Sequence, residues 1–399
     1  MAARRRAAGK SAASNHHIRF LLQEPEAHTA RNFRRRPTPH KAPLFPANSR
    51  HFPQATLARP GFYRQTRQVK VAVFSTKPYD QRFLTEANLS GAHELVFLEN
   101  RLNERSATLA AGCSAVCAFV NDELNAPSLQ VLADCGVRLV ALRCAGFNQV
   151  DLKAAEAHCI SVRRVPAYSP HAVAEFTLGL ILTLNRKYHR AFNRVREGNF
   201  GIDGLLGFDL HGKTVGLVGT GKIGLLTAKP LAAMGCELLG FDPFPNDEFR
   251  AMGGTYVSLD ELFQRADIIS LHLPLTPASF HLINTATLAR MRRGVMIINT
   301  SRGALIDAVA VVEALKSGHV GYLGLDVYEQ EADIFYEDLS GEIIQDDVLQ
   351  RLLTFPNVLI TSHQAYFTDT ALRNIAETTV RNLDDFEHGR GTGNEVKVT

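Results

Sequence analysis

A strand that runs into three closely spaced glycines and then a helix constrains this chain more than any other feature. The apolar run Thr214–Val218 leads into Gly219-Thr220-Gly221-Lys222-Ile223-Gly224, which has the pattern G-x-G-x-x-G. Glycines at these positions allow a tight turn, close approach of the backbone to a pyrophosphate, and close packing of helix on strand. The helix N-terminus adds the positive end of a dipole. The segment therefore predicts a dinucleotide-binding unit.

An acidic residue after the next strand strengthens this prediction. Asp242 follows the predicted strand Glu237–Phe241 and lies 23 residues after Gly219. A carboxylate at this place accepts hydrogen bonds from ribose hydroxyls and repels a 2′-phosphate, so we expect NAD rather than NADP. The residues expected to contact the cofactor are Gly219, Gly221, Lys222, Ile223, Gly224, Asp242, Thr300 and Asp326.

One residue conflicts with a regular helix after the glycines. Pro230 falls inside the predicted helix, and a proline in a helix interior costs about 3 kcal/mol and bends the helix. We therefore expect a bend or an early end near residue 230.

The chain from residue 69 alternates short β-branched runs with helical stretches, which predicts parallel sheets covered by helices. Apolar residues occupy most faces of a long helix expected over 171–192, so it should be buried between domains or against a second subunit. The predicted strands are Val71–Ser75, Leu95–Leu98, Ala115–Val120, Leu139–Arg143, Ser161–Val165, Thr214–Val218, Glu237–Phe241, Ile268–Leu271, Val295–Asn299, Tyr322–Val327 and Val358–Thr361.

Charge is distributed unevenly along the sequence. Residues 1–68 carry 12 Arg and 2 Lys against two acids, so the remainder has a net charge of −8 within an overall +4. An Arg-rich, acid-poor segment of this kind is typical of an organellar transit peptide, for a mitochondrion or a chloroplast; the alternative is a basic tail on a cytoplasmic protein. The acidic remainder gives no reason to expect nucleic-acid binding.

The sequence indicates neither a membrane-spanning protein nor a protein held together by metal ions or disulfides. No apolar run approaches the roughly 20 residues that a membrane span requires, so we expect no membrane segment. The six cysteines form no CxxC pair and no Cys/His cluster with zinc-ligand spacing, so the sequence predicts neither a metal site nor a disulfide framework.

Three predicted strands after the glycines end in polar residues with complementary chemistry. Ligands bind beyond the carboxyl ends of strands in open α/β sheets, so Arg302, Glu331 and His363 are expected to converge. Arg302 offers a planar fork for a carboxylate, and His363 can exchange a proton near neutral pH. Glu331 would orient the imidazole, with Glu329 as the competing carboxylate. The set fits hydride reduction of a small 2-keto acid.

The chain resembles the D-isomer-specific 2-hydroxyacid dehydrogenases, and within them the fermentative NAD-dependent D-lactate dehydrogenases. The resemblance covers essentially all of 69–399. It is carried by the stretches 142–148, 165–170, 215–224, 299–307, 325–331, 344–347 and 362–365.

The resemblance implies roles for individual residues and a fold for the chain. Arg302, Glu331 and His363 would be the catalytic set, the Ala145 and Gly146 amides would hold the substrate carboxylate, and Tyr168 would contact the substrate. The fold implied is α/β with two Rossmann-like parallel-sheet domains, a flavodoxin-like substrate domain and an inserted NAD-binding domain. The expected parts are a basic extension over 1–68, the substrate domain over 69–168 and 366–399, and the NAD-binding domain over 169–365.

The activity implied is reversible reduction of pyruvate to D-lactate with NADH, in a homo-oligomer, either a dimer or a tetramer. The alternatives are a reductase for glyoxylate, hydroxypyruvate or another 2-keto acid, and an NAD-sensing binding protein like the related corepressors. One departure is Phe176, where family members often carry histidine. It does not touch the proposed chemistry.

Overall fold

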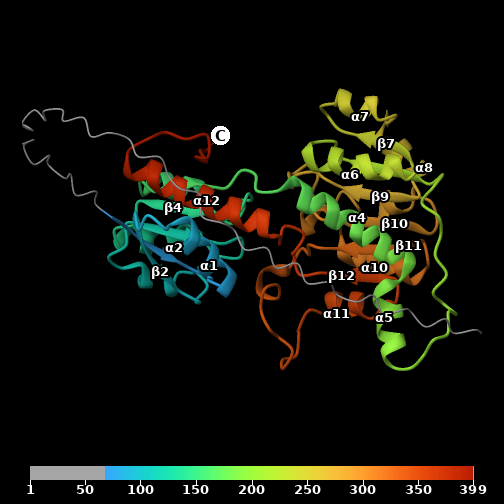
Figure 1. The fold of residues 1–399 in the computed structure, drawn as a ribbon, viewed down its shortest axis with the longest axis horizontal. Helices are drawn as coiled ribbons and strands as arrows, with labels where there is room; N and C mark the ends of the chain where they lie inside the picture. The colour runs from blue at the N-terminus through green and yellow to red at the C-terminus, as the bar shows by residue number, and fades with distance from the viewer. Residues whose placement is uncertain (1–67, 399) are drawn as a thin grey trace, which may run out of the picture. The chain divides into compact units, whose positions relative to one another are not determined.

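A computed structural model describes residues 68–398 of the chain, and the predicted basic extension over 1–68 therefore lies almost wholly outside the described residues. Two parallel sheets organise the described part (Figure 1). The first sheet has the order β2-β1-β3-β4-β5, which is the order of flavodoxin-like folds. Its strands are β1 (Val69–Val73), β2 (His93–Phe97), β3 (Ala115–Ala118), β4 (Leu139–Leu142) and β5 (Ser161–Arg163).

The second sheet has the order β12-β11-β10-β9-β6-β7-β8. Read from β8, this is the Rossmann order 3-2-1-4-5-6 with one strand added. Its strands are β6 (Thr214–Val218), β7 (Glu237–Phe241), β8 (Thr255–Tyr256), β9 (Ile268–Leu271), β10 (Val295–Asn299), β11 (Val320–Leu325) and β12 (Val358–Ile360). The α/β class with two parallel sheets is confirmed.

Helices connect the strands, because neighbouring parallel strands need a crossover connection. Those of the first sheet are α1 (Pro78–Ala87), η1 (Ser106–Ala110), α2 (Ala126–Asp134), α3 (Leu152–Ala157) and α12 (Asp369–Glu387). The remainder are α4 (Pro170–Arg186), α5 (Tyr188–Arg196), α6 (Lys222–Ala233), α7 (Asp247–Ala251), α8 (Leu259–Arg265), α9 (Thr285–Leu288), η2 (Gly303–Leu305), α10 (Ala308–Lys316), η3 (Glu331–Asp333) and α11 (Asp347–Leu353). None of the helices within 68–398 is both long and apolar enough to cross a bilayer.

Apolar side chains fill both faces of each sheet. In β4, Leu139 and Ala141 face one core cluster and Val140 and Leu142 face the other, because side chains alternate along a strand. All five residues of β10 are buried, as expected for a strand covered on both faces. Burial on both faces explains why the strands could be found from their apolar runs.

The C-terminal helix α12 returns to the first sheet and packs on α1 and β4. Arg163 at the end of β5 donates to the carbonyl of Asn382 across 2.9 Å, and the Asn382 amide donates to the Arg164 carbonyl across 3.0 Å. These bonds attach the C-terminal segment to the sheet formed by residues 69–163. The residues at which the two domains meet, near 168 and 365, stay predictions.

One prediction about helices is wrong, and of the bend or early end expected near residue 230 the structure excludes the early end. The long helix expected over 171–192 is divided at Lys187, whose φ of 53° is left-handed, so α4 ends and α5 begins there. Of these two helices, only α4 carries buried residues. The expected early end at Pro230 does not occur, because α6 continues to Ala233. Pro230 stands in the last turn of α6, where its missing N–H removes a single helical hydrogen bond. A bend there stays a prediction.

Candidate active site

The glycine loop between β6 and α6 has the close contacts that its pattern predicts. Gly219 has a φ of 100°, and a Cβ there would lie 2.2 Å from the His272 carbonyl oxygen. A Cβ on Gly224 would lie 2.2 Å from the Gly219 carbonyl oxygen, so α6 can approach the loop only without a side chain at 224. A Cβ on Gly221 would enter open space at the start of α6. Lys222 and Ile223 form the first turn of that helix, where N–H groups are free for an anion.

Asp242 lies directly after β7, beside the glycine loop. Its Oδ2 accepts a 2.7 Å hydrogen bond from the Thr220 N–H, and its Oδ1 accepts one of 2.9 Å from the Phe244 N–H. Two backbone donors hold a negative charge at the end of the second strand of the dinucleotide unit. The carboxylate is therefore fixed beside the place where a bound ribose is expected.

The arginine loop follows β10. The Asn299 side chain donates to the Arg302 carbonyl across 2.8 Å and accepts from the Ser301 N–H across 3.0 Å, which sets the turn. Thr300 is buried, and its hydroxyl lies 2.9 Å from that of Thr177 on α4. Arg302 itself reaches the first sheet's loop, since a Cβ on Gly146 would lie 2.8 Å from its Nη2.

Glu331 and His363 meet as predicted. His363 Nδ1 lies 2.7 Å from Glu331 Oε1, and the two side chains are 16% and 17% exposed. The other glutamate oxygen accepts a 2.8 Å hydrogen bond from the Tyr328 N–H, which orients the carboxylate. The pair leaves His363 Nε2 as the ring nitrogen that can face a substrate.

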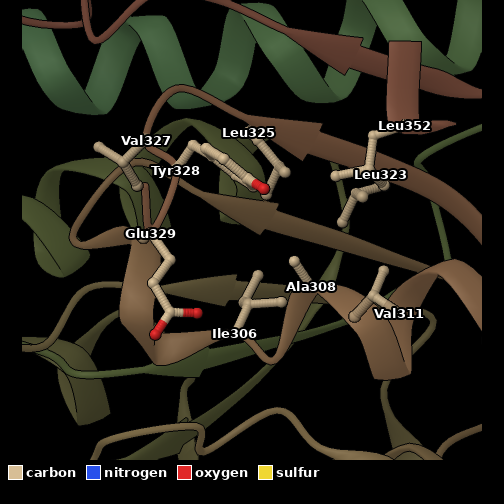
Figure 2. A pocket seen from close by; sticks show the side chains of 10 residues that line it. Ile306, Ala308, Val311, Leu323, Leu325, Val327, Tyr328, Glu329 and Leu352 are labelled. Atoms are coloured by element: carbon tan, nitrogen blue, oxygen red, sulfur yellow. The ribbon is translucent and has the colours of Figure 1, made fainter. Parts of the chain in front are cut away.

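The competing carboxylate, Glu329, is engaged elsewhere. It lies 3.0 Å from His281 Nε2 and lines a small, largely apolar cavity with Ile306, Leu323 and Leu325 (Figure 2). Of the two glutamates that the sequence offered, the structure therefore pairs Glu331 with His363.

Asp326 is engaged by hydrogen bonds to the loop that carries His363. Its carboxylate is fully buried and accepts bonds from Thr361 Oγ1 at 2.6 Å and from the N–H groups of Gln364 and Ala365, both at 2.9 Å. Its carbonyl accepts from the His363 N–H at 2.7 Å. In this structure Asp326 holds the histidine loop, and its contact with the cofactor stays a prediction.

The residues expected to bind the substrate come from the first sheet. Within 68–398 the N–H groups of Ala145 and Gly146 donate to no other residue, while the Ala145 carbonyl accepts from Arg164 across 2.8 Å. Tyr168 packs edge-on against Tyr366 with ring centroids 5.9 Å apart, and burial raises the pKa of its hydroxyl. A pocket gathers Ala145, Gly146, Tyr168, Arg302 and His363.

Sequence reasoning missed part of the pocket wall. Phe119, Tyr336, Tyr366 and Ile375 line it, and the rings of Phe119 and Tyr336 lie edge-on at 5.0 Å. Tyr336 comes from the charged segment after Glu331, where no periodic pattern marks it as buried. Nothing in the local sequence could have identified it.

A buried arginine and a cysteine complete the wall. Arg143 is 1% exposed, pairs with Asp80 at 3.2 Å, and its guanidinium lies over the Phe119 ring. Burial raises the pKa of the Cys144 thiol to about 11, so the thiol is neutral near pH 7 and is a poor nucleophile.

The chain is similar to known proteins over most of its length. Residues 178–365 match the model for the D-isomer specific 2-hydroxyacid dehydrogenase, NAD binding domain. The D-lactate dehydrogenase of Escherichia coli is 51% identical over 328 residues, which are 82% of this chain and 100% of that protein.

Solved structures show the same likeness. The apo-structure of the Escherichia coli D-lactate dehydrogenase has a TM-score of 0.76 at 49% identity, and covers 82% of this chain and 100% of that one. A structure described as the pyruvate reductase of Chlamydomonas reinhardtii has a TM-score of 0.78 at 43% identity, with 82% and 98% covered. NAD-type dinucleotide binding follows from the matched domain and from NAD-bound neighbours. The chain belongs to the D-isomer-specific 2-hydroxyacid dehydrogenase family.

Proposed function

We propose that this protein is an NAD-dependent D-lactate dehydrogenase that reduces pyruvate to D-lactate reversibly. The observation that carries the proposal is the 2.7 Å His363–Glu331 pair, whose histidine lines one pocket with Arg302, Ala145 and Gly146. The N–H groups of Ala145 and Gly146 have no acceptor among the described residues. The names of the similar proteins support the choice of D-lactate within the family.

In this proposal one group of residues binds the substrate and another transfers the proton. The Arg302 guanidinium and the two amides bind the carboxylate of the 2-keto acid, which fixes the carbonyl carbon in place. Bound NADH would supply the hydride. His363 Nε2 donates a proton to the carbonyl oxygen as it gains negative charge, and Glu331 compensates the charge of the imidazolium while holding its orientation. In the reverse direction His363 accepts that proton.

The cofactor is NAD rather than NADP in this proposal. The Asp242 carboxylate is fixed by the N–H groups of Thr220 and Phe244, so it can accept from the ribose hydroxyls without moving. A 2′-phosphate would bring a second negative charge against it. Comparison of KM for NADH and NADPH tests this choice, and equal values would contradict it.

The pocket wall favours a small side chain on the substrate. Phe119, Tyr336 and Tyr366 enclose the pocket with aromatic rings, and burial of a methyl group against them is favourable. We therefore expect pyruvate to be preferred over phenylpyruvate.

The deciding experiment measures NADH oxidation by the purified chain with pyruvate, glyoxylate, hydroxypyruvate and phenylpyruvate, followed by determination of the product's chirality. Preference for pyruvate with D-lactate as product supports the proposal. Preference for glyoxylate or hydroxypyruvate would assign the chain to the alternative reductases. NADH binding without turnover of any of the four acids would favour an NAD-sensing binding protein.

We also propose that residues 1–68 direct the protein to a mitochondrion or a chloroplast, because they carry 12 Arg and 2 Lys against two acids. Fluorescence microscopy of residues 1–68 fused to a fluorescent protein tests this proposal. The control fuses residues 69–399 alone. Diffuse cytoplasmic fluorescence of both fusions would contradict it.

A further inference from the structure

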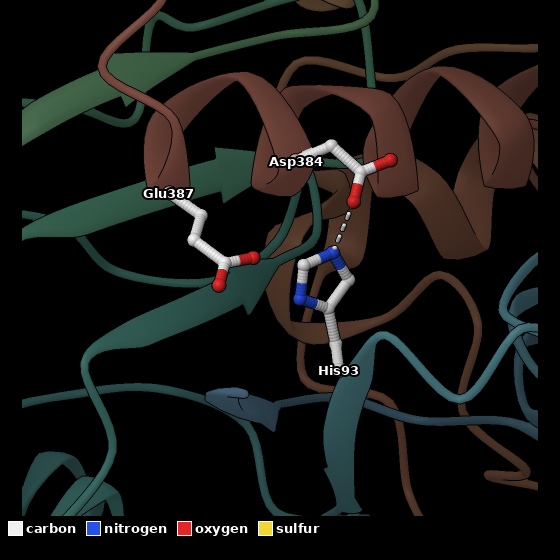
Figure 3. Close-up of side chains that lie close together, drawn as sticks. All are labelled: His93, Asp384 and Glu387. Carbon is white, nitrogen blue, oxygen red and sulfur yellow. Dashed lines mark hydrogen bonds and ion pairs between the residues drawn. The ribbon is translucent and has the colours of Figure 1, made fainter. Parts of the chain in front are cut away.

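A buried histidine lies between two carboxylates away from the pocket. His93 begins β2, the edge strand of the first sheet, and its side chain is 0% exposed. Asp384 and Glu387 stand three residues apart in the last turn of α12, so both face the same side of that helix. One nitrogen of His93 and one oxygen of each acid lie within 4.8 Å of one another (Figure 3).

The hydrogen bonds of His93 leave one ring nitrogen unused. His93 Nε2 lies 2.9 Å from Asp384 Oδ1, and an ionised carboxylate only accepts, so in the neutral ring Nε2 carries the hydrogen. Nδ1 then holds a lone pair, and this buried atom has no partner within the described residues. Figure 3 shows it on the edge of the ring that faces Glu387. A buried acceptor without a donor is unfavourable, and a neutral imidazole lone pair is a common metal ligand.

We propose that His93, Asp384 and Glu387 form a binding site for a divalent transition-metal ion of the Zn²⁺ type. His93 Nδ1 and the Glu387 carboxylate supply ligands, and Asp384 orients the imidazole through Nε2, as carboxylates do behind metal-bound histidines. A mixed nitrogen and oxygen donor set suits Zn²⁺ or Co²⁺ better than Mg²⁺ or Ca²⁺, which prefer oxygen alone. Water completes the coordination, because the ligand Glu387 is only partly buried.

The charges around the cluster favour a cation. In the part of the chain that the structure describes, neither Asp384 nor Glu387 forms an ion pair with a lysine or arginine, whereas their neighbour Asp385 pairs with Arg390 at 2.7 Å. With His93 neutral, the cluster carries two negative charges. The backbone that holds the histidine is fixed, since Asn88 accepts from the His93 N–H at 3.2 Å and donates to its carbonyl at 2.8 Å.

The proposed ion would join the edge strand β2 to the end of α12, which are 291 residues apart in sequence. This separation is why cysteine and histidine spacing gave no sign of a metal. The cluster shares no residue with the substrate pocket, so we expect the metal to raise the melting temperature while turnover of pyruvate stays unchanged.

The test uses the full chain, freed of metal with a chelator, and variants at the cluster. Binding of Zn²⁺ is measured by calorimetry, and Co²⁺ is followed by its visible absorption, which reports coordination by protein ligands. Glu387→Gln should weaken binding about tenfold or more and abolish the rise in melting temperature. Asp384→Asn should also weaken Zn²⁺ binding, because Asp384 no longer orients the imidazole of His93 as a carboxylate does. Glu377→Gln, an exposed acid on the same helix, is the matched control and should bind as the unmodified chain does.

The result that overturns the proposal is equal binding by Glu387→Gln and Glu377→Gln, which would place the ion at other cysteines or histidines. Absence of saturable Zn²⁺ binding would also overturn it. Since Glu387 is only partly buried, its replacement tests the site even where His93→Gln fails to fold.

Discussion

The hydroxyl of Tyr336 donates a hydrogen bond to the backbone carbonyl of His363 across 2.9 Å, and both residues have a left-handed backbone. Their φ values are 71° and 52°, a region that side chains other than glycine rarely occupy. Strained backbone of this kind persists where surrounding contacts hold it, and it gathers at functional sites. The bond therefore ties the pocket wall to the residue proposed as acid and base.

Tyr336→Phe should lower kcat for pyruvate reduction while leaving KM and NADH affinity nearly unchanged. The ring and its contact with Phe119 remain, and only the hydrogen bond that positions His363 is lost. A bond of about 1 to 1.5 kcal/mol corresponds to a loss of up to about tenfold. Steady-state kinetics over pH 5–9 measure it, with a shifted pH profile of kcat as the sign of an altered His363. Tyr322→Phe, on β11, is the control, and equal kinetics of the two variants would contradict the role.

Two glycines of the same loop should respond differently to alanine. Gly221 has an ordinary φ of −67° and open space where a Cβ would lie, so Gly221→Ala should keep the melting temperature. The new methyl group would stand at the start of α6, where the pyrophosphate is expected, and should weaken NADH binding about tenfold or more. Gly224→Ala should lower the melting temperature as well, since its Cβ would meet the Gly219 carbonyl oxygen. Fluorescence titration with NADH and thermal unfolding separate the two effects; unchanged NADH affinity in Gly221→Ala would contradict the assignment.

The stability of the fold should depend on His272 below pH 6.5. Burial lowers the pKa of this histidine from 6.5 to about 4, and its Nδ1 is enclosed without a partner in the described part of the chain. The unfolded chain therefore binds more protons between these values, so the contribution to stability is complete above pH 6.5 and is lost as the pH falls through about 4.

Urea unfolding at pH 7.5 and pH 5.0 measures this dependence. Between pH 7.5 and pH 5.0 the free energy of unfolding should fall, and about 2 kcal/mol of this fall should come from His272, which stays neutral in the folded chain. His272→Gln should remove that part of the loss, whereas His388→Gln, at an exposed histidine, should not. An identical pH dependence in all three proteins would show that His272 is protonated in the folded state.

The segment that includes α5 should form the contact between subunits. None of the side chains within α5 is buried, and the loop after it exposes Phe200, Ile202 and Leu206 by 75%, 81% and 86%. Apolar side chains gathered in this way are typical of interfaces. We expect a dimer or tetramer by light scattering, and Ile202→Glu should reduce the mass. Leu89→Glu, at an apolar residue 84% exposed after α1, should not. A monomeric unmodified chain would refute the expectation.

The strands were predictable because helices cover both faces of each sheet. Side chains on both sides of a strand are then buried, so strands such as β10 read as short apolar runs in the sequence. The break at Lys187 was not, because lysine has no special propensity for the left-handed backbone that Lys187 adopts. The sequence could not decide between a bend and an early end at Pro230. The cost of this proline is small in the last turn of a helix whose Leu231 is fully buried, so packing outweighs the cost and the helix does not end there.

The candidate site was predictable where the residues stand at strand ends. Arg302, Glu331 and His363 each follow a strand of one parallel sheet, and the geometry of such sheets brings those ends together. Tyr336 and the engaged carboxylate of Asp326 were not predictable, because their positions depend on contacts between loops that no periodicity records.

The bonds of Asp326 have a consequence for protein engineering. Two of the three groups that its carboxylate accepts from are backbone N–H groups, so the loop is held without the side chains of Ser362 and Gln364, which are exposed. A library that randomises these two positions should therefore retain the imidazole in its place, and could adapt the approach to the pocket for other acids. Position 326 offers no such freedom, since neither a shorter nor a neutral side chain would accept all three bonds.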